Sequence, residues 1–150
     1  MKAIVQRVSR ASVVVDAQTV GSIGRGLLVL AAVQRGDDAS DRRWMADKLV
    51  NLRIFPDADG RFDRSLLDIA PEGAGVLLVS NFTVAGSTRK GRRPSFDDAM
   101  RPPEAEAAFD ALVEEVRQRG VTVHTGTFGA HMDVSLVNDG PVTLVLDSRE

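Results

Sequence analysis

Hydrophobic and polar positions along the chain predict a domain built mainly from strands. From Lys2 to Asp16 the sequence is rich in Val and Ile and has neither Gly nor Pro, which is typical of one long strand or two consecutive strands. A short strand is expected at Thr19 to Ile23, where it would pair with the first. Two later runs, Leu27 to Val33 and Val76 to Val79, are apolar on both faces, so we expect central strands there.

Two segments have the apolar spacing of helices that cover a sheet. Asp38 or Ser40 can cap a helix that runs to about Leu52, and a second helix starts at the Pro102-Pro103 pair and stops at Gly120. The apolar positions expected to face the sheet are Met45, Leu49 and Leu52 in the first helix and Ala105, Ala108, Phe109, Leu112 and Val116 in the second. Short strands are also predicted at residues 53–55, 65–69 and 121–127.

The C-terminal part of the chain contains two more strand-like runs, 133–137 and 142–146, with Asn138-Asp139-Gly140-Pro141 between them. Asn, Asp, Gly and Pro tolerate tight backbone bends, so this segment predicts a hairpin turn. The Gly-Pro pair joins a residue without a Cβ to one whose φ is fixed. We therefore expect a stiff loop that presents backbone atoms.

Composition supports a single globular domain over residues 1–150. The chain has 43% hydrophobic and 27% charged residues, and a chain of this length buries about 70% of its unfolded surface in one core. Its net charge of -2 excludes a wholly basic nucleic-acid binder, so any contact with RNA must use a local patch. The longest apolar run, Leu27 to Val33, is far shorter than a membrane span. We expect a soluble, unexported protein without membrane contact.

Three polar features stand out from this background. Arg89-Lys90-Gly91-Arg92-Arg93 places four cations within five residues, in a segment that is either solvated or docks on a phosphate backbone. Ser80 to Thr83 ends a buried strand, where polar groups either bond local backbone or face a pocket. Arg7 lies on a largely apolar strand face and would need backbone carbonyls or a carboxylate as partners. A bulge would instead turn Arg7 outward, and the sequence leaves both arrangements open.

Common catalytic signatures are absent from the sequence. It contains no Gly-x-Ser-x-Gly elbow and no Gly-rich nucleotide-binding motif, and neither histidine is spaced to activate Ser80 or Thr83 in a triad. Without cysteine, and with only two histidines, a zinc site is not expected. The acidic turn 56–60 lacks the remaining ligands of a calcium loop. No metal or cofactor is therefore predicted.

Six segments spread over nearly the whole chain form a recognisable series: Gln6-Arg7-Val8, residues 51–55, Ser80-Asn81-Phe82-Thr83, residues 89–96, residues 128–132 and Asn138 to Thr143. In their order and spacing they resemble the D-aminoacyl-tRNA deacylase family. The resemblance implies an α+β fold with a mostly antiparallel, barrel-like β body flanked by two main helices. It also implies a cytoplasmic homodimer that hydrolyses the ester of D-aminoacyl-tRNA without a cofactor, with RNA rather than DNA as its partner.

The same resemblance assigns roles to residues. Ser80, Phe82 and Thr83 match the family's Ser-Gln-x-Thr signature, with Asn81 one methylene shorter than the usual Gln. A second signature meets the first across the dimer interface and is matched by Asn138, Gly140, Pro141 and Thr143. Arg7 would brace the Gly-Pro loop. The terminal adenosine of tRNA would lie at the turn that holds Phe128, Gly129 and Met132, and the tRNA backbone would contact Arg89, Lys90, Arg92 and Arg93.

Two mechanisms fit these residues. An aminoacyl ester beside a ribose 2′-hydroxyl is already reactive, so backbone N–H groups near Phe82 and Thr83 could stabilise the oxyanion while the hydroxyl assists. Thr83 as a covalent nucleophile is the competing mechanism. Rigid Gly140 and Pro141 backbone would exclude an L side chain and admit D-aminoacyl and glycyl groups. A noncatalytic RNA-binding or interaction module that uses the same basic loop is the alternative function.

Overall fold

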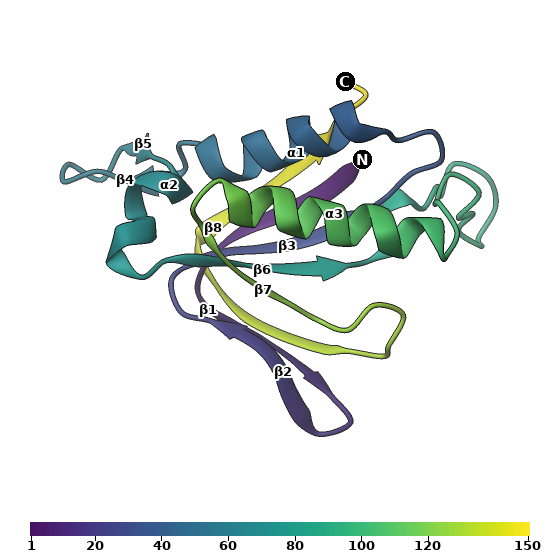
Figure 1. Cartoon of the computed structure of the whole chain (residues 1–150), viewed down its shortest axis with the longest axis horizontal. Coiled ribbons are helices and arrows are strands. Elements are labelled where there is room, and N and C mark those ends of the chain that lie inside the picture. Colours follow the sequence, from purple (N-terminus) through teal and green to yellow (C-terminus); the bar gives the residue numbers. More distant parts are fainter.

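One long, bent strand holds the sheet together. The computed structural model covers residues 1–150, and in it β1 (Lys2–Val15) pairs with three other strands, all antiparallel (Figure 1). Its first half lies between β3 (Gly26–Ala32) and β8 (Asp133–Asp147), and its second half lies between β2 (Gln18–Ile23) and β8. The two halves of β1 therefore take part in different portions of one curled sheet.

The sheet continues from β3 through two parallel strands, β6 (Gly75–Ser80) and β7 (Thr122–Thr125), in the order β2-β1-β3-β6-β7. Its two ends approach each other, because a Cβ on Gly21 of β2 would lie 2.3 Å from the carbonyl oxygen of Thr125 in β7. Three of the five strand pairings in this sheet are antiparallel. The prediction of a mostly antiparallel, barrel-like body is confirmed, and the barrel is nearly closed.

Two helices, α1 (Ala39–Asn51) and α3 (Glu104–Gln118), lie beside each other over one face of the sheet, as expected (Figure 1). The Arg42 guanidinium of α1 is 3.3 Å from the Glu115 carboxylate of α3. Most of the predicted apolar positions, namely Met45, Leu49, Phe109, Leu112 and Val116, belong to a cluster of 25 buried residues, and Leu52 and Ala108 pack against it. Burial of these positions, rather than helix propensity, accounts for most of the stability of such helices. None of the helices has the length and hydropathy of a transmembrane segment.

The strand predicted at 65–69 is wrong, because these residues form α2 (Leu66–Ile69). The Ser65 side chain accepts from the Asp68 N–H, while the Asp68 carboxylate accepts from the Ser65 N–H at 2.7 Å. This reciprocal capping box satisfies two donors that a strand would leave unpaired here. Two 3₁₀ turns, η1 (Ala70–Glu72) and η2 (Phe82–Ala85), follow along the chain. The strand expected at 53–55 is displaced to β4 (Phe55–Pro56), which pairs with β5 (Phe62–Arg64).

The predicted C-terminal hairpin is also wrong. Both halves of the segment belong to β8 and pair with the same strand, since Thr143 is opposite Gln6 and Asn138 is opposite Val8. Residues 139–142 therefore have only Arg7 opposite them and form a bulge, in which residues 139–141 are exposed and Val142 is buried. Bend-forming residues tolerate a bulge as well as a chain reversal, and only the pairing partner distinguishes the two.

Candidate active site

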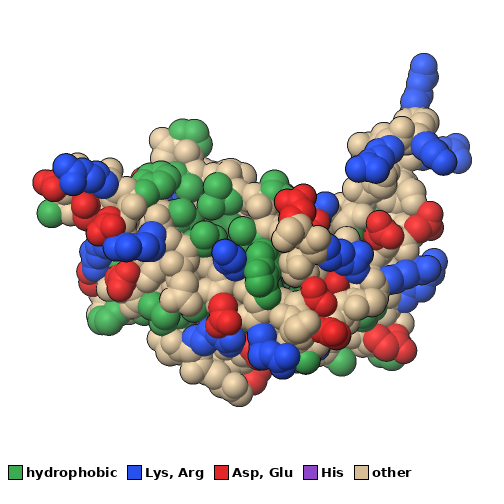
Figure 2. Space-filling view, turned by 90° about the horizontal axis from the view of Figure 1, so that it is seen from above, with side chains coloured by type: hydrophobic (Ala, Val, Ile, Leu, Met, Phe, Trp, Pro, Cys, Tyr) green, Lys and Arg blue, Asp and Glu red, His purple; other side chains and the backbone are tan.

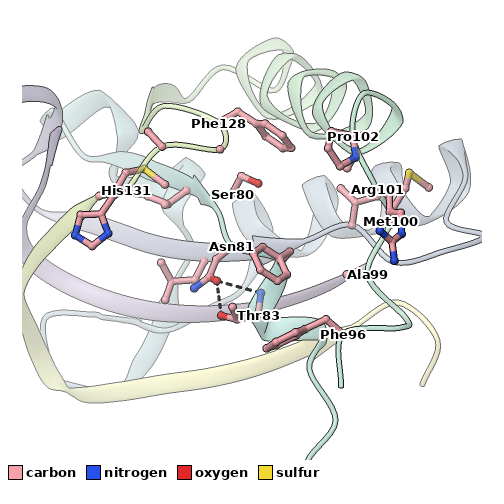
Figure 3. Close-up of a pocket in the computed structure, with 18 of the residues that line it drawn as sticks. Ser80, Asn81, Thr83, Phe96, Ala99, Met100, Arg101, Pro102, Phe128 and His131 are labelled. Carbon is pink, nitrogen blue, oxygen red and sulfur yellow. Dashed lines mark hydrogen bonds between the residues drawn. The ribbon is translucent and has the colours of Figure 1, made fainter. Parts of the chain in front are cut away.

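A large pocket lies where β6 ends. It has a volume of about 840 Å³ and is formed by η2 and the residues before it, segment 96–105, and segment 128–134 (Figure 3). Twelve of its 19 lining residues are hydrophobic. A cavity with this lining suits a ligand that is largely apolar or aromatic and carries a few polar groups.

Asn81 organises the polar end of the pocket. Its backbone N–H donates to the Ala31 carbonyl of β3 at 2.8 Å, which fixes the chain as it leaves the sheet. Its side-chain Oδ1 accepts from both the Thr83 hydroxyl (2.5 Å) and the Thr83 N–H (3.2 Å), as the dashed lines in Figure 3 mark. Ser80 lines the pocket and makes no hydrogen bond through its side chain with the rest of the chain.

These bonds decide which backbone donors face a substrate. The Thr83 N–H already has an acceptor in Asn81, whereas Phe82 is the first residue of η2, where an N–H has no acceptor within the turn. Of the two oxyanion donors expected from the sequence, the Phe82 N–H is therefore the available one. His131 also lines the pocket, but no hydrogen bond joins it to Thr83, and Figure 3 shows Asn81 between them.

Aromatic rings form one wall of the pocket. Phe82 and Phe96 meet edge to face with ring centroids 5.1 Å apart, and Phe82 remains 55% exposed. Gly86 makes this contact possible, because a Cβ there would lie 2.8 Å from the Phe96 ring. The exposed Phe82 ring thus has a fixed position beside the free Phe82 N–H.

The residues expected to bind adenosine form another wall. Phe128, Gly129 and Met132 all line the pocket, and Phe128 packs against Phe109 of α3 at 6.5 Å between centroids. Gly126 allows Met132 to fold over the strand end, since a Cβ on Gly126 would lie 2.5 Å from the Met132 sulfur. The fold therefore brings this turn and Ser80 to Thr83 into one cavity.

The Gly-Pro segment lies outside that cavity and is held by its neighbours. The Asn138 side chain accepts from the Val142 N–H at 2.8 Å and donates to the Thr143 hydroxyl at 2.9 Å. Gly140 has a φ of +155°, a conformation that other residues rarely adopt, and the Gly140-Pro141 peptide bond is cis. Asp139, Gly140 and Pro141 are exposed.

Arg7 connects this segment to the rest of the body. Its side chain is buried, and its guanidinium donates to the carbonyls of Asp139 (2.8 Å) and Ile54 (2.6 Å). The Asp139 carboxylate lies 3.5 Å away, and the Phe62 ring packs over the guanidinium at 5.3 Å. The predicted carbonyl partners are thus present, and Arg7 points inward although the neighbouring pairing is irregular.

Within one chain the two signature segments do not meet. Ser80 of β6 pairs with Ala31 of β3, and Ala31 pairs with Ala3 of β1, whereas the Gly-Pro bulge lies opposite Arg7 of β1. Ala3 and Arg7 are four residues apart on β1, a distance of about 13 Å at the usual rise along a strand. None of residues 138–143 lines the pocket.

The four basic residues that were expected to contact the tRNA backbone lie on a loop that projects from the body. The Ser87 and Ser95 backbones pair with each other, and the loop between them carries Arg89, Lys90, Arg92 and Arg93, all exposed. Figure 2 shows the loop standing out from the body with its basic side chains spread into solvent. None of these four side chains has a hydrogen bond or ion pair with the chain.

Comparisons with known proteins identify the family. Residues 4–147 match the family model described as D-Tyr-tRNA(Tyr) deacylase. The chain belongs to this deacylase family. Proteins named D-aminoacyl-tRNA deacylase from Thermomicrobium roseum and Roseiflexus sp. are 53% and 55% identical, over 100% and 99% of this chain and 96% and 94% of their own lengths.

Solved structures agree on the fold of this deacylase-family chain. A structure named c-Myc DNA Unwinding Element Binding Protein matches with a TM-score of 0.90 and 38% identity, over 98% of both chains. Another, of a probable eukaryotic D-amino acid tRNA deacylase, has a TM-score of 0.83 over 97% of both chains. Its 20% identity supports the fold alone.

The pocket also includes residues that the sequence did not single out. Ala99, Met100 and Arg101 line it, all from the stretch that leads into α3. The Met100 N–H donates to the Val33 carbonyl at the end of β3, which draws this stretch over the sheet. The sequence predicted only the start of a helix in this stretch, because the hydrogen bond between Met100 and Val33 joins residues far apart in the chain and leaves no pattern in the local sequence.

Proposed function

We propose that the protein hydrolyses the ester bond of D-aminoacyl-tRNA in the cytoplasm, releasing the D-amino acid and tRNA. The observation that carries the proposal is the pocket at Ser80 to Thr83 in a chain that belongs to the deacylase family. Its apolar lining suits an adenine base and its polar end suits an ester. The reaction would remove D-amino acids before they enter translation, and glycine is expected to be removed as well.

Catalysis in this proposal relies on backbone and substrate groups. The Phe82 N–H would donate to the carbonyl oxygen as water attacks and negative charge develops there. The leaving ribose oxygen would take up a proton, with the neighbouring 2′-hydroxyl assisting. Ser80, Asn81 and Thr83 would position the ester and the attacking water. The support is that Thr83 has no base in contact, since its hydroxyl donates to the Asn81 amide.

Chirality would be read by the Gly-Pro segment of a second subunit. The exposed Gly140 and Pro141 are about 13 Å along β1 from their own pocket, so a complete site needs another copy of the chain. A homodimer is further supported by exposed apolar side chains at Phe62, Val137 and Val145 and by the unpaired outer edge of β8. The partner's rigid backbone would fill the space that an L side chain requires.

The direct test compares esters that differ only in chirality. Purified protein should deacylate a D-aminoacyl-tRNA at least a hundredfold faster than its L counterpart, the size expected for a steric clash of about 3 kcal/mol. Glycyl-tRNA should be hydrolysed because it has no side chain to exclude. A matched Ser80→Trp variant, which fills the pocket, should lose activity on all three. Equal rates for the D and L esters would refute the proposal.

Thr83→Ala separates the two mechanisms. If Thr83 only positions groups, kcat should fall by roughly tenfold, whereas a covalent nucleophile would be indispensable. Single-turnover deacylation with saturating enzyme measures the chemical step independently of binding. Complete loss of hydrolysis with tRNA affinity intact would exclude the substrate-assisted mechanism.

A noncatalytic nucleic-acid-binding module is the second candidate. The exposed basic loop supports it, as does the name of the solved structure with 38% identity, which refers to binding a DNA element. This candidate predicts nucleic-acid binding that Ser80→Trp does not affect and no ester hydrolysis. The chirality assay above distinguishes the two.

A further inference from the structure

The pocket has one wall to which the proposed function assigns no role. Ser80 to Thr83 would hold the ester, and Phe128 to Met132 would hold the adenine. The remaining wall is the stretch from Phe96 to Ala105, and Figure 3 shows it on the side of the cavity away from His131. The 5′ side of a bound terminal nucleoside would leave along this wall.

This wall carries a single free cation. Arg101 is the only lysine or arginine among the residues lining the pocket, and no aspartate or glutamate lines it. The side chain is exposed and has neither a hydrogen bond nor an ion pair within the chain, whereas several other exposed arginines, such as Arg25 and Arg53, are paired. An otherwise uncharged pocket thus has an unneutralised guanidinium at its rim.

The backbone around Arg101 is fixed. Met100 donates its N–H to the Val33 carbonyl at 2.9 Å, and the Arg101 carbonyl accepts from the Ala105 N–H at 3.0 Å. The N-terminal end of α3 begins three residues later without a side-chain cap, so its positive end also points toward this region. Glu104 and Glu106 in the first turn offset that field, which leaves the Arg101 guanidinium as the main attraction for an anion.

We propose that Arg101 binds the phosphate that joins the terminal adenosine of tRNA to the preceding nucleotide. The assignment rests on the proposed function, because it is the adenosine and ester positions that direct the 5′ phosphate to this wall. A guanidinium matches a phosphate with two parallel N–H donors. Arg101 is a binding residue in this role and takes no part in bond cleavage.

Three esters of the same D-amino acid test the assignment: aminoacyl-adenosine, aminoacyl-adenosine 5′-phosphate and aminoacyl-tRNA. Arg101→Ala should lower kcat/KM roughly tenfold for the two phosphate-bearing substrates, the loss expected for one charge-assisted bond, and less than twofold for the nucleoside ester. The loss should be mainly in KM. Arg117→Ala, an exposed arginine at the other end of α3, is the matched control and should change none of the three.

Two further measurements identify charge as the cause. Arg101→Lys should recover part of the lost kcat/KM because it keeps the charge without the paired donors. Arg101→Ala should also reduce the slope of log affinity against log salt by about 0.7, the value for one phosphate contact on a single strand.

Each contrary result has a distinct meaning. An equal loss on all three esters would show a structural role for Arg101, and an unchanged KM for the tRNA ester would show no phosphate contact. Either result overturns the assignment while the proposed function stands. Wild-type protein that leaves all three esters intact would instead overturn the proposed function and this assignment with it.

Discussion

Asn81 controls the geometry of the pocket through one oxygen atom. Its Oδ1 accepts both the hydroxyl and the N–H of Thr83, which caps η2 and leaves the Phe82 N–H free. Asn81→Ala should lower the free energy of unfolding by about 1 kcal/mol, the usual cost of a lost cap. It should reduce kcat more than it raises KM, because the donor to the developing charge loses its fixed position. Urea denaturation and steady-state deacylation measure the two effects.

A control for this substitution is Asn51→Ala. The Asn51 side chain donates to the Asp47 carbonyl within α1, outside the pocket, so its loss removes an equivalent amide without touching the site. Its kcat should equal that of the wild type. An Asn81→Ala enzyme with the same kcat would show that η2 keeps its geometry without the cap.

At single positions, the sequence predicted chemistry better than geometry. A guanidinium on a largely apolar strand face needs backbone carbonyls or a carboxylate, so the kind of partner that Arg7 has was predictable, whereas its inward direction was left open. Asn81 was recognisable as a departure from Gln, but its bond to Thr83 depends on the chain turning into a 3₁₀ helix directly after β6. A hydrogen bond between the side chain of one residue and the residue two positions later forms only at certain backbone angles, and the residue types alone do not determine those angles.

Helix caps give the molecule a defined sensitivity to acid. A hydrogen bond from Ser148 lowers the pKa of Asp41, and bonds from Ser65 lower the pKa of Asp68. Carboxyls whose folded-state pKa is depressed stabilise the fold above their unfolded pKa, and that contribution is lost as pH falls through the folded value. Unfolding free energy should therefore be level from about pH 7 to 5 and decline below about pH 4, near the unfolded carboxyl pKa.

Urea denaturation of Asp41→Asn at pH 7, 5 and 3 tests this account. Without the titrating group the variant should lose stability at pH 7 and show a shallower decline toward pH 3. Asp59→Asn, which changes an exposed aspartate whose side chain has no partner, should follow the wild-type curve. Parallel curves for Asp41→Asn and wild type would mean that the cap contributes nothing to acid sensitivity.

The basic loop should act at a distance from the chemistry. Replacing Arg89, Lys90, Arg92 and Arg93 by Ser removes four unpaired cations from a projection outside the pocket. Affinity for tRNA should fall, with a salt slope smaller by about 0.7 to 0.9 for each phosphate that the loop no longer neutralises. Hydrolysis of D-aminoacyl-adenosine should not change. Wild-type tRNA affinity that is independent of salt would contradict a role for the loop.

Elements with periodic burial were predictable, whereas those defined by pairing were not. Helices α1 and α3 follow from their apolar stripes, and the central strands β3 and β6 follow from runs buried on both faces. The short α2 was missed because its four residues are too few to show a period, and only its capping box marks it. For β8, local residues allow both a hairpin and a bulge, and β1 decides between them.

The pocket is formed by several elements of the folded chain together and by no single one. Its walls come from the end of β6, the approach to α3 and the turn before β8, which are brought together by parallel pairing of β3 with β6 and by the bond between Met100 and Val33. The Gly-Pro bulge faces outward from the same body, about four residues along β1. The proposed site, which uses both segments, would therefore need two copies of the chain.

Mixing two variants tests whether the site is shared. Gly140→Ala would place a Cβ 2.6 Å from the Val142 nitrogen, so the loop must move, and this variant should hydrolyse L- as well as D-aminoacyl-tRNA. Ser80→Trp should be inactive but keeps an intact Gly-Pro segment. With Ser80→Trp in excess, nearly every Gly140→Ala subunit is paired with a Ser80→Trp subunit. The active pocket of that pair then faces a normal Gly-Pro segment.

Excess Ser80→Trp subunit should therefore abolish hydrolysis of L-aminoacyl-tRNA, while hydrolysis of the D ester persists. The inactive Ser80→Trp variant would thus restore chiral selectivity to the Gly140→Ala variant. The subunits must be exchanged by co-refolding, and the two rates are compared per Gly140→Ala subunit. The double variant, which carries both substitutions in one chain, is the control and should have no effect when added in the same excess, because it supplies a defective Gly-Pro segment. If the L rate per subunit stays constant in the mixture with Ser80→Trp, the Gly-Pro segment acts within its own chain. The pocket and the Gly-Pro segment of one subunit, about 13 Å apart along β1, would then have to come together.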